Sequence, residues 1–507
     1  MGYKVIRKLL LAIGLIFPIA SFCSAADIYI AQNAVGADTG ADCTNAHSAT
    51  WFNTAANWGV GSGLISAGDT VHWCGTYTGT AGQTGLTFQG NGSPGSPITL
   101  LFEPGAVMTA PYWAVAIDIG TSRSYITIDG GPNGIIENTA NGTNLANKQQ
   151  SRGVVCSKCN DIEIRNLTIR NLYIRQGGSS EQVDGGLCIH LPDSHNNIVV
   201  HHSTLSEASM GIIVYPDRDG IPRTGWEFHS NTLIELHWGI ASLSWTTTQI
   251  SDGILIHDNE YFGNSHWDDP TFFFHNDGIF LSADNGSEHR NCQVYNNYLH
   301  GTMAPNTTAQ IYLSTNTKNC RVYNNVMEVT SGTTSPGTFY QNGGVSNEVY
   351  NNTVVGGGSC YNAASSSNIV LKNNICVNSV NGIFLSAGST LAESDFNVFF
   401  NVTGQGSCGA FCDNGANLDT LTAWQNFSGK DLNSTTADPK LDPTSHLQAG
   451  SSAIGLGANL TSLGIATLNS DKDGNARPSS GPWDAGAYQF AASVRPQPPS
   501  NLTSIVK

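Results

Sequence analysis

Short runs of alternating apolar and polar residues recur between Ser203 and Asn374 at a nearly constant spacing. Each run ends in an Asn-type turn, as in VYNN at Asn297, and successive copies are separated by 28, 28, 38, 28, 27 and 22 residues. A second phrase of similar pattern, such as DGIFLS from Asp277, lies between the copies. The period is that of strands, so the pattern predicts a solenoid with two short strands and a turn per repeat.

Such a repeat buries only a few Ile, Leu and Val side chains, and it must therefore stack on its neighbours, at about 4.8 Å per rung. Equivalent positions then form columns, so residues one repeat apart lie side by side. Asn at the repeated corner suits left-handed backbone and can hydrogen-bond along the stack. We expect an all-β, single-domain parallel β-helix with capped ends.

The VYNN and GIFLS phrases resemble those of the right-handed parallel β-helix (pectate-lyase-like) family, which includes polysaccharide lyases, glycoside hydrolases and phage-type surface proteins. The resemblance covers most of the chain and implies a fold rather than one activity. The expected organisation is a signal peptide (1–26), an N-terminal cap with the first coils (27–113), a regular β-helix (114–400), a closing segment (401–490) and a Pro-rich tail (491–507).

Basic residues precede the apolar run Leu9–Ala20 at the start of the chain, which is typical of a secretory signal cleaved after Ala25 or Ala26. Lipidation of Cys23 is the alternative, although Phe22 is a poor residue before a lipidated cysteine. We expect an exported, extracellular or cell-surface protein with no transmembrane segment after signal removal.

The chain is acidic, with a formal net charge of −16 that becomes more negative when the basic leader is removed. An acidic surface repels phosphate backbones, so we expect no nucleic-acid partner. The partner implied by the resemblance is an extracellular polysaccharide, bound by a monomer.

Cysteines in an exported chain favour disulfides. Cys292 and Cys320 align between repeats, as a rung-to-rung disulfide or as a core sulfur ladder. A CxxC can instead indicate redox chemistry or half of a zinc site. The local disulfide candidates are Cys43 with Cys74, Cys156 with Cys159, and Cys408 with Cys412.

The rhythm of the repeats breaks twice, and long turns of a solenoid commonly build the walls of a binding groove. One break, around HWDDPTFFFH, lengthens a step to 38 residues just before Asp277. The other lies between Leu172 and Gln182. Near the N-terminus, Trp51, Trp58 and Trp73 could cap the core or form a sugar platform.

Aligning the repeats on Gly186, Gly211, Gly239 and Gly278 places Glu207 and Glu235 about 5 Å apart on adjacent rungs. Such a pair can serve as general acid and nucleophile or base, as in glycosidases, or can bind Ca²⁺. It can also be a solvated surface pair without a function.

His237 and Asp277 complete the predicted catalytic set with Glu207 and Glu235. His237 is either a proton shuttle or a surface residue. Asp277 is similar to the aspartates that precede this strand in polygalacturonases, although an Asp-Gly turn explains it equally well. The residues predicted to bind substrate are Asp184, Tyr215, Trp238, Trp267, Asp268, Asp269 and His275.

His201, His229 and His257 are 28 residues apart and should stack in one outward column. Three stacked imidazoles can bind zinc, but Tyr295, Tyr323 and Tyr350 continue the column and favour a surface ladder. We therefore predict no metal among the site residues, with Ca²⁺ at the glutamate pair as the open alternative.

The absence of Lys between Asp184 and Arg290 argues against elimination from a uronate, which needs a cation to neutralise charge. Hydrolysis of a neutral or weakly charged glycan is therefore the first expectation. A calcium-assisted lyase and a non-catalytic surface or adhesive solenoid are the alternatives.

Overall fold

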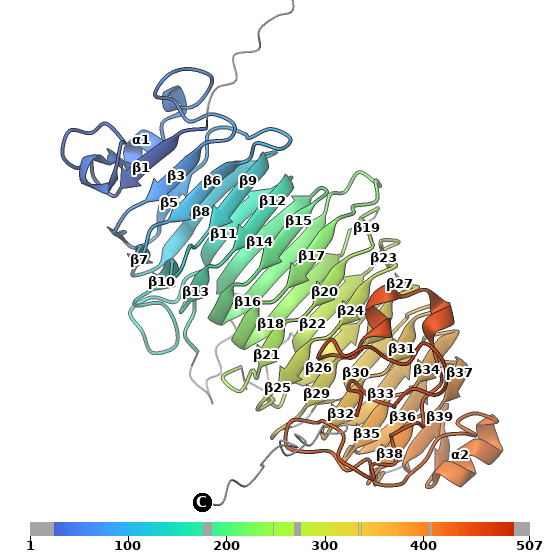
Figure 1. Ribbon diagram of the computed structural model, residues 1–507. Helices are drawn as coiled ribbons and strands as arrows, with labels where there is room; N and C mark the ends of the chain where they lie inside the picture. The colour runs from blue at the N-terminus through green and yellow to red at the C-terminus, as the bar shows by residue number, and fades with distance from the viewer. Residues whose placement is uncertain are drawn as a thin grey trace, which may run out of the picture.

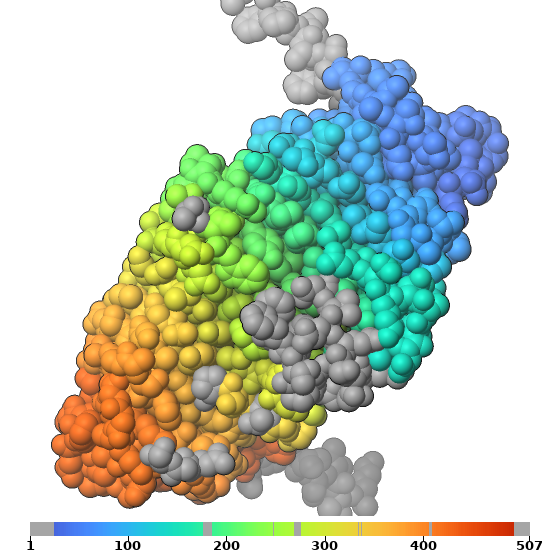
Figure 2. All heavy atoms as spheres, turned by 180° about the vertical axis from the view of Figure 1, so that it is seen from behind, coloured from blue at the N-terminus to red at the C-terminus, as the bar shows by residue number. Residues whose placement is uncertain are grey.

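The computed structural model describes residues 25–175, 185–246, 248–267, 275–332, 334–335, 337–404 and 408–490. The chain winds into stacked coils, and nearly all neighbouring strands pair in parallel with the next coil. Figure 1 shows the coils following one another in chain order from the blue end to the orange end, and Figure 2 shows the same elongated body from behind. The predicted all-β parallel β-helix is confirmed.

Three ladders of strands form the walls of the solenoid. The Asn-side sheet contains β1 (Asp27–Ala31), β3 (Thr70–Trp73), β6 (Ile98–Phe102), β9 (Ser124–Asp129), β12 (Asn160–Arg165), β15 (Ile198–His201), β17 (Trp226–His229), β20 (Leu255–His257), β24 (Gln293–Tyr295), β28 (Arg321–Tyr323), β31 (Glu348–Tyr350), β34 (Ile369–Lys372) and β37 (Leu391–Asp395). The site wall contains β5 (Gln83–Thr87), β8 (Trp113–Thr121), β11 (Ser151–Ser157), β14 (Gly186–Ser194), β16 (Thr204–Pro216), β18 (Thr232–Ser244), β22 (Asn276–Ala283), β26 (Thr307–Leu313), β30 (Gly337–Asn342), β33 (Ser359–Ala364) and β36 (Asn381–Ser386). The third wall contains β7 (Val107–Ala110), β10 (Ile135–Asn138), β13 (Thr168–Arg170), β21 (Glu260–Phe262), β25 (Tyr298–His300), β29 (Val326–Glu328), β32 (Thr353–Val355), β35 (Ile375–Val377) and β38 (Val398–Phe400).

The two long strands β16 and β18 belong to both the third wall and the site wall. Thr204 pairs with Thr168 on the third wall, whereas Ile212 of the same strand pairs with Ile189 on the site wall. Each strand bends between the walls at a glutamate, Glu207 or Glu235, whose φ is +49°. Left-handed backbone costs an ordinary L-residue roughly 1–2 kcal/mol, so both corners are strained.

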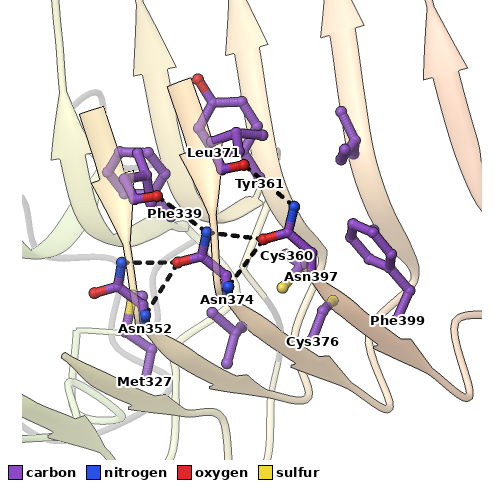
Figure 3. A pocket seen from close by; sticks show the side chains of 14 residues that line it. Met327, Phe339, Asn352, Cys360, Tyr361, Leu371, Asn374, Cys376, Asn397 and Phe399 are labelled. Atoms are coloured by element: carbon purple, nitrogen blue, oxygen red, sulfur yellow. Dashed lines mark hydrogen bonds between the residues drawn. The ribbon is translucent and has the colours of Figure 1, made fainter. Parts of the chain in front are cut away.

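The two residues of each Asn-Asn corner have different structural roles. The first residue takes the left-handed backbone, as at Asn296 with φ +56°. The second is buried: the Asn297 backbone N–H donates to Asn325 Oδ1 at 3.0 Å, and its Nδ2 donates to the Ile256 carbonyl at 3.0 Å. The corner therefore satisfies its own buried polar groups. Figure 3 shows three rungs of this ladder, which contains Asn231, Asn259, Asn297, Asn325, Asn352, Asn374 and Asn397.

The predicted histidine column is present on the Asn-side sheet. His229 stacks between His201 at 4.8 Å and His257 at 5.0 Å, and Tyr295 continues the stack from His257 at 4.5 Å. Burial and the neighbouring imidazoles lower the pKa of His229. Within the described ranges, no cluster of three His, Cys, Asp or Glu side chains is arranged to hold a metal ion.

Both ends of the solenoid are covered by aromatic side chains. Trp58 and Trp73 are buried in the core, where Trp58 meets Phe52 of α1 (Ala49–Phe52) edge to face, so they offer no sugar platform; Trp51 is partly buried against His47. At the other end, Trp424 of α2 (Leu421–Ser428) stacks on Phe411. The C-terminal residues then fold back along the outside (Figure 1), where Leu460, Ile465, Leu468 and Trp483 pack on Tyr295, Tyr323 and Tyr350.

Across the described part of the chain, every helix is too short or too polar to cross a bilayer. The three local disulfides expected from the sequence are confirmed, and Cys292 with Cys320 forms a fourth that joins adjacent rungs. Cys188, Cys360 and Cys376 are buried free thiols.

The glycine alignment is right for three of its four members. Gly211, Gly239 and Gly278 share a column, but Leu187 pairs with Met210, which makes Cys188 the partner of Gly211. The alignment at Gly186 is therefore wrong by two residues. A shift of two keeps the same residues inside and outside, so the hydrophobic pattern cannot detect it.

Candidate functional site

One small cavity lies inside the solenoid and does not serve as a site. It has a volume of about 30 Å³ and is lined by core residues of the C-terminal coils, including Met327, Phe339, Tyr361 and Cys376 (Figure 3). This volume holds about one water molecule. This cavity is therefore too small for a sugar residue.

Glu207 and Glu235 are neighbours on adjacent rungs, as the spacing predicts, because Ala208 pairs with Leu236. A third residue, His266, stands between them: its Nδ1 is 3.1 Å from Glu207 Oε1 and 3.9 Å from Glu235 Oε2. The three side chains are 23%, 13% and 41% exposed for Glu207, Glu235 and His266. The cluster is thus accessible mainly through His266 and Glu207.

The Glu235 side chain anchors the turn that carries His266. Its Oε1 accepts from the Ser265 hydroxyl at 2.8 Å, and its Oε2 accepts from the His266 backbone N–H at 2.9 Å. The Trp267 indole N–H donates to the Glu235 carbonyl at 3.1 Å. Both carboxylate oxygens of Glu235 therefore already have donors.

The residue type at these two corners is unusual for its column. The positions in line with Glu207 and Glu235 on neighbouring rungs are Asn171, Gly263 and Gly301, all left-handed, with φ of +58°, +66° and +103°. Asn and Gly adopt this backbone at little cost, whereas Glu adopts it at a cost of roughly 1–2 kcal/mol. The carboxylates at these two corners can act either as anchors or as reactive groups.

The two irregular segments predicted to flank the groove meet at their described ends. Arg175 donates from Nε to the His266 carbonyl at 3.0 Å, and its guanidinium lies 5.4 Å from the centre of the Trp267 ring. Arg175 is almost fully buried. Of the predicted substrate-binding residues, Asp184, Asp268 and Asp269 lie outside the described residues.

Next to the glutamates, the wall is filled by closely packed rings. His237 is fully buried, with its ring centre 5.0 Å from that of Trp238 and 5.8 Å from that of Trp267. The Trp238 indole N–H donates to the His275 carbonyl at 2.6 Å. Trp238 and Trp267 are both buried, so neither of these two predicted sugar-binding rings offers an exposed face.

His275 and Asp277 form a hydrogen-bonded pair at the start of β22. The His275 Nδ1 lies 2.5 Å from Asp277 Oδ2, and Asp277 Oδ1 accepts the Ala309 N–H at 3.1 Å. Asp277 has no solvent exposure, whereas the His275 side chain is 36% exposed.

The electrostatics of this pair follow from burial and proximity. Burial raises the pKa of Asp277 to about 6, although His275 and the Ala309 N–H oppose that rise. Burial alone would lower the pKa of His275, but the adjacent Asp277 carboxylate outweighs it, and the pKa of His275 is raised. Such an arrangement fixes the tautomer and orientation of an imidazole that reaches the surface.

A row of aromatic rings continues along the site wall, which the repeat analysis missed. Phe280 lies 5.0 Å from Tyr312, and Tyr312 lies 4.8 Å from Tyr340, in stacked geometry. His275 contacts Phe280 and Tyr312 by its edge, at 5.0 and 5.3 Å between ring centres. The equivalent positions of DGIFLS, AQIYLS and TFYQN were the signal that could have revealed this row.

Glu207 and Glu235 do not fit a Ca²⁺ site in this arrangement. Ca²⁺ takes 6–8 oxygen ligands. Here, both Glu235 oxygens accept hydrogen bonds from the turn, and the His266 ring lies close to both carboxylates. The Ca²⁺ alternative is therefore not supported at this pair.

No protein-family model matches this chain, and no curated protein matches its sequence. Solved structures with a similar fold include the GH136 lacto-N-biosidase from Eubacterium ramulus, with a TM-score of 0.52 and 12% identity over 73% of this chain and 67% of that one. XylC in complex with xylose has a TM-score of 0.48 at 9% identity, over 92% and 98% of the two chains. The Streptococcus pneumoniae surface protein and adhesin PfbA has a TM-score of 0.39 at 12% identity, over 64% and 90%. At these identities the likeness shows the fold alone, and this chain is a right-handed parallel β-helix protein.

Proposed function

We propose that the protein is an exported glycoside hydrolase that cleaves an extracellular polysaccharide on the outer face of the site wall. The observation that carries the proposal is the His275–Asp277 pair, in which a fully buried carboxylate orients a partly exposed imidazole. The fold is compatible with this chemistry, because the lacto-N-biosidase shares it. A fold alone does not specify a reaction.

In the proposed mechanism, His275 transfers a proton at the substrate and Asp277 acts through it as a positioning residue. Glu207 supplies the second acid–base group, with His266 beside it. Hydrolysis breaks the glycosidic C–O bond, adds the oxygen of water to the sugar carbon and returns a proton to the leaving oxygen.

A non-catalytic glycan-binding solenoid is the second candidate. The observation that favours it is the Glu235 carboxylate, whose oxygens are both committed to holding the turn at Ser265 and His266. In that case the glutamates shape the surface and perform no chemistry. A lyase is less well supported, because Arg175, the cation beside the cluster, is buried and bonded to the His266 carbonyl.

Export belongs to the same proposal. The predicted signal peptide lies largely outside the described residues, and the four disulfides are those expected of a chain that folds in an oxidising compartment. We propose that the mature protein acts as a monomer.

The test is a reducing-end assay with the mature protein on neutral and uronic polysaccharides, with ultraviolet detection of unsaturated products in parallel. Replacing His275 with Ala, or Glu207 with Gln, should reduce turnover by about 10²-fold or more. Glu393→Gln, an exposed glutamate on β37, is the matched control and should be neutral. Binding without turnover supports the second candidate, and unsaturated products support a lyase.

A further inference from the structure

Trp245 differs from every other tryptophan of this protein in its exposure. The chain has ten tryptophans, and Trp245 is the most exposed of them, at 38%. An exposed indole forgoes the stabilisation that burial would provide. Since single exposed apolar residues are common on proteins, exposure alone does not define a site.

The second observation is that packing and hydrogen bonding fix the position of Trp245. Its ring meets Tyr215 at 6.3 Å and 78°, and Trp238 at 6.4 Å and 77°. Both contacts are edge-to-face, and the Trp245 carbonyl accepts from Asn285 Nδ2 at 2.8 Å. An oriented, exposed aromatic ring is a ready-made surface for a flat apolar ligand face.

Trp245 is also close to the proposed acid–base centre. The Trp238 ring that contacts Trp245 also lies 6.1 Å from His275. The Trp245 and His275 rings are therefore no farther apart than the sum of these two distances. One oligosaccharide on the site wall can contact both.

We propose that Trp245, with Tyr215 beside it, is a stacking platform for a neutral sugar ring of the glycan that is cleaved at His275. This inference rests on the proposed function and names one of its specificity-determining residues. The C–H face of a pyranose is apolar enough to stack on an indole, whose area is large and whose conformational freedom is small.

The rest of the aromatic row cannot serve in the same way. Phe280 and Tyr312 stack face to face with an interplanar angle of 20°, and Tyr312 and Tyr340 with an angle of 25°. Their inner faces are occupied by each other, so mainly edges are presented outward. The Trp245 ring contacts its aromatic neighbours edge to face and is not part of this stack.

The charges next to the platform favour a neutral sugar over a uronate. Asp284 lies alongside, because its backbone N–H donates to the carbonyl of Ser244, the residue before Trp245. Its carboxylate would repel a uronate. Arg218, in the neighbouring loop that contacts Thr248, is already paired with Asp193 at 3.1 Å.

The test measures glycan binding separately from turnover. Affinity electrophoresis in gels containing neutral or uronic polysaccharides would compare wild type, Trp245→Ala and Trp245→Phe, with Phe427→Ala as control because Phe427 is an exposed aromatic on the distant α2. We expect Trp245→Ala to bind a neutral polymer about tenfold more weakly, equivalent to about 1.4 kcal/mol. Trp245→Phe should retain part of the affinity, and the control should match wild type.

Acrylamide quenching of tryptophan fluorescence gives a second readout. In wild type, a bound neutral oligosaccharide should reduce the fraction of tryptophan fluorescence that acrylamide quenches. In Trp245→Phe, this accessible fraction should be missing, and the oligosaccharide should therefore change the quenching little. Equal binding by wild type and Trp245→Ala overturns the platform while turnover still supports the proposed function. Preference for uronic polymers overturns the sugar class, and a wild type that binds no glycan overturns both proposals.

Discussion

The Nδ1 atom of His275 lies 2.5 Å from Oδ2 of Asp277, a carboxylate with no solvent exposure that comes only two residues later in the chain. A buried carboxylate is costly unless it is paired, and this one has only His275 and the Ala309 N–H as hydrogen-bond partners among the described residues. The pair therefore serves to hold one imidazole in one orientation at the surface of the site wall.

Asp277→Asn should lower the pKa of His275. The carboxylate is the group that raises it, and an amide of the same shape keeps the packing but removes the charge. An NMR titration of the His275 ring protons would measure the change. Asp284→Asn, at a neighbouring carboxylate, is the control, and an unchanged His275 pKa in Asp277→Asn would contradict the proposed pairing.

The same variant should gain stability relative to wild type as the pH rises. The folded pKa of Asp277 is about 6, above its unfolded value near 3.9, so ionisation costs stability between these values and the cost is complete above them. His275 acts in the same direction, because its stabilisation is present below about pH 6.5 and is lost as the pH rises through its raised folded pKa. Urea unfolding from pH 4 to 8 would measure both free energies. If the difference in unfolding free energy between Asp277→Asn and wild type did not change with pH, the raised pKa of Asp277 would be refuted.

Glu235→Gln and Glu207→Gln should have different effects. Glu235 accepts two hydrogen bonds from the turn at Ser265 and His266. In Glu235→Gln, the side-chain NH₂ group would face one of these two donors, and this loss of an acceptor should destabilise the protein by about 1–3 kcal/mol. Glu207 has His266 as its partner and should change stability by less than about 1 kcal/mol. Thermal unfolding of the two variants would compare them. Equal destabilisation would show that both glutamates are anchors.

Asn325→Ala should be among the most damaging changes outside the site. It removes the side chain that accepts from Asn297 and donates to both the Val294 carbonyl and Asn352. Several buried polar groups lose partners, and we expect a loss of about 2–4 kcal/mol in the free energy of unfolding. Asn401→Gly is the control, because φ there is +52° and the residue is exposed. A mild effect at Asn325 would mean that water replaces the ladder.

The fold was predictable because it is periodic. The VYNN corners specify both the left-handed residue and the ladder residue, so one short phrase determines the coil and its stacking. The predicted strand register is wrong at Gly186, because a shift of two residues leaves the hydrophobic alternation unchanged.

The site was predictable only in part. Vertical stacking placed Glu207 beside Glu235 correctly, because both lie in regular coils. It could not show that His266 stands between them or that Arg175 reaches the same turn, because both belong to the irregular segments, where position is set by tertiary contacts. For the same reason, the sequence predicts His275 and Asp277 as separate site residues and does not predict their pairing.

The proposed function depends on His275, which Asp277 orients, as the group that transfers protons in glycosidic bond cleavage. The most direct measurement is turnover of a neutral polysaccharide by His275→Ala, by Asp277→Asn and by the control Glu393→Gln, each confirmed as folded by circular dichroism. We predict a loss of about 10²-fold or more for His275→Ala, a smaller loss for Asp277→Asn and none for the control. Wild-type turnover by His275→Ala would exclude His275 as the proton-transfer group.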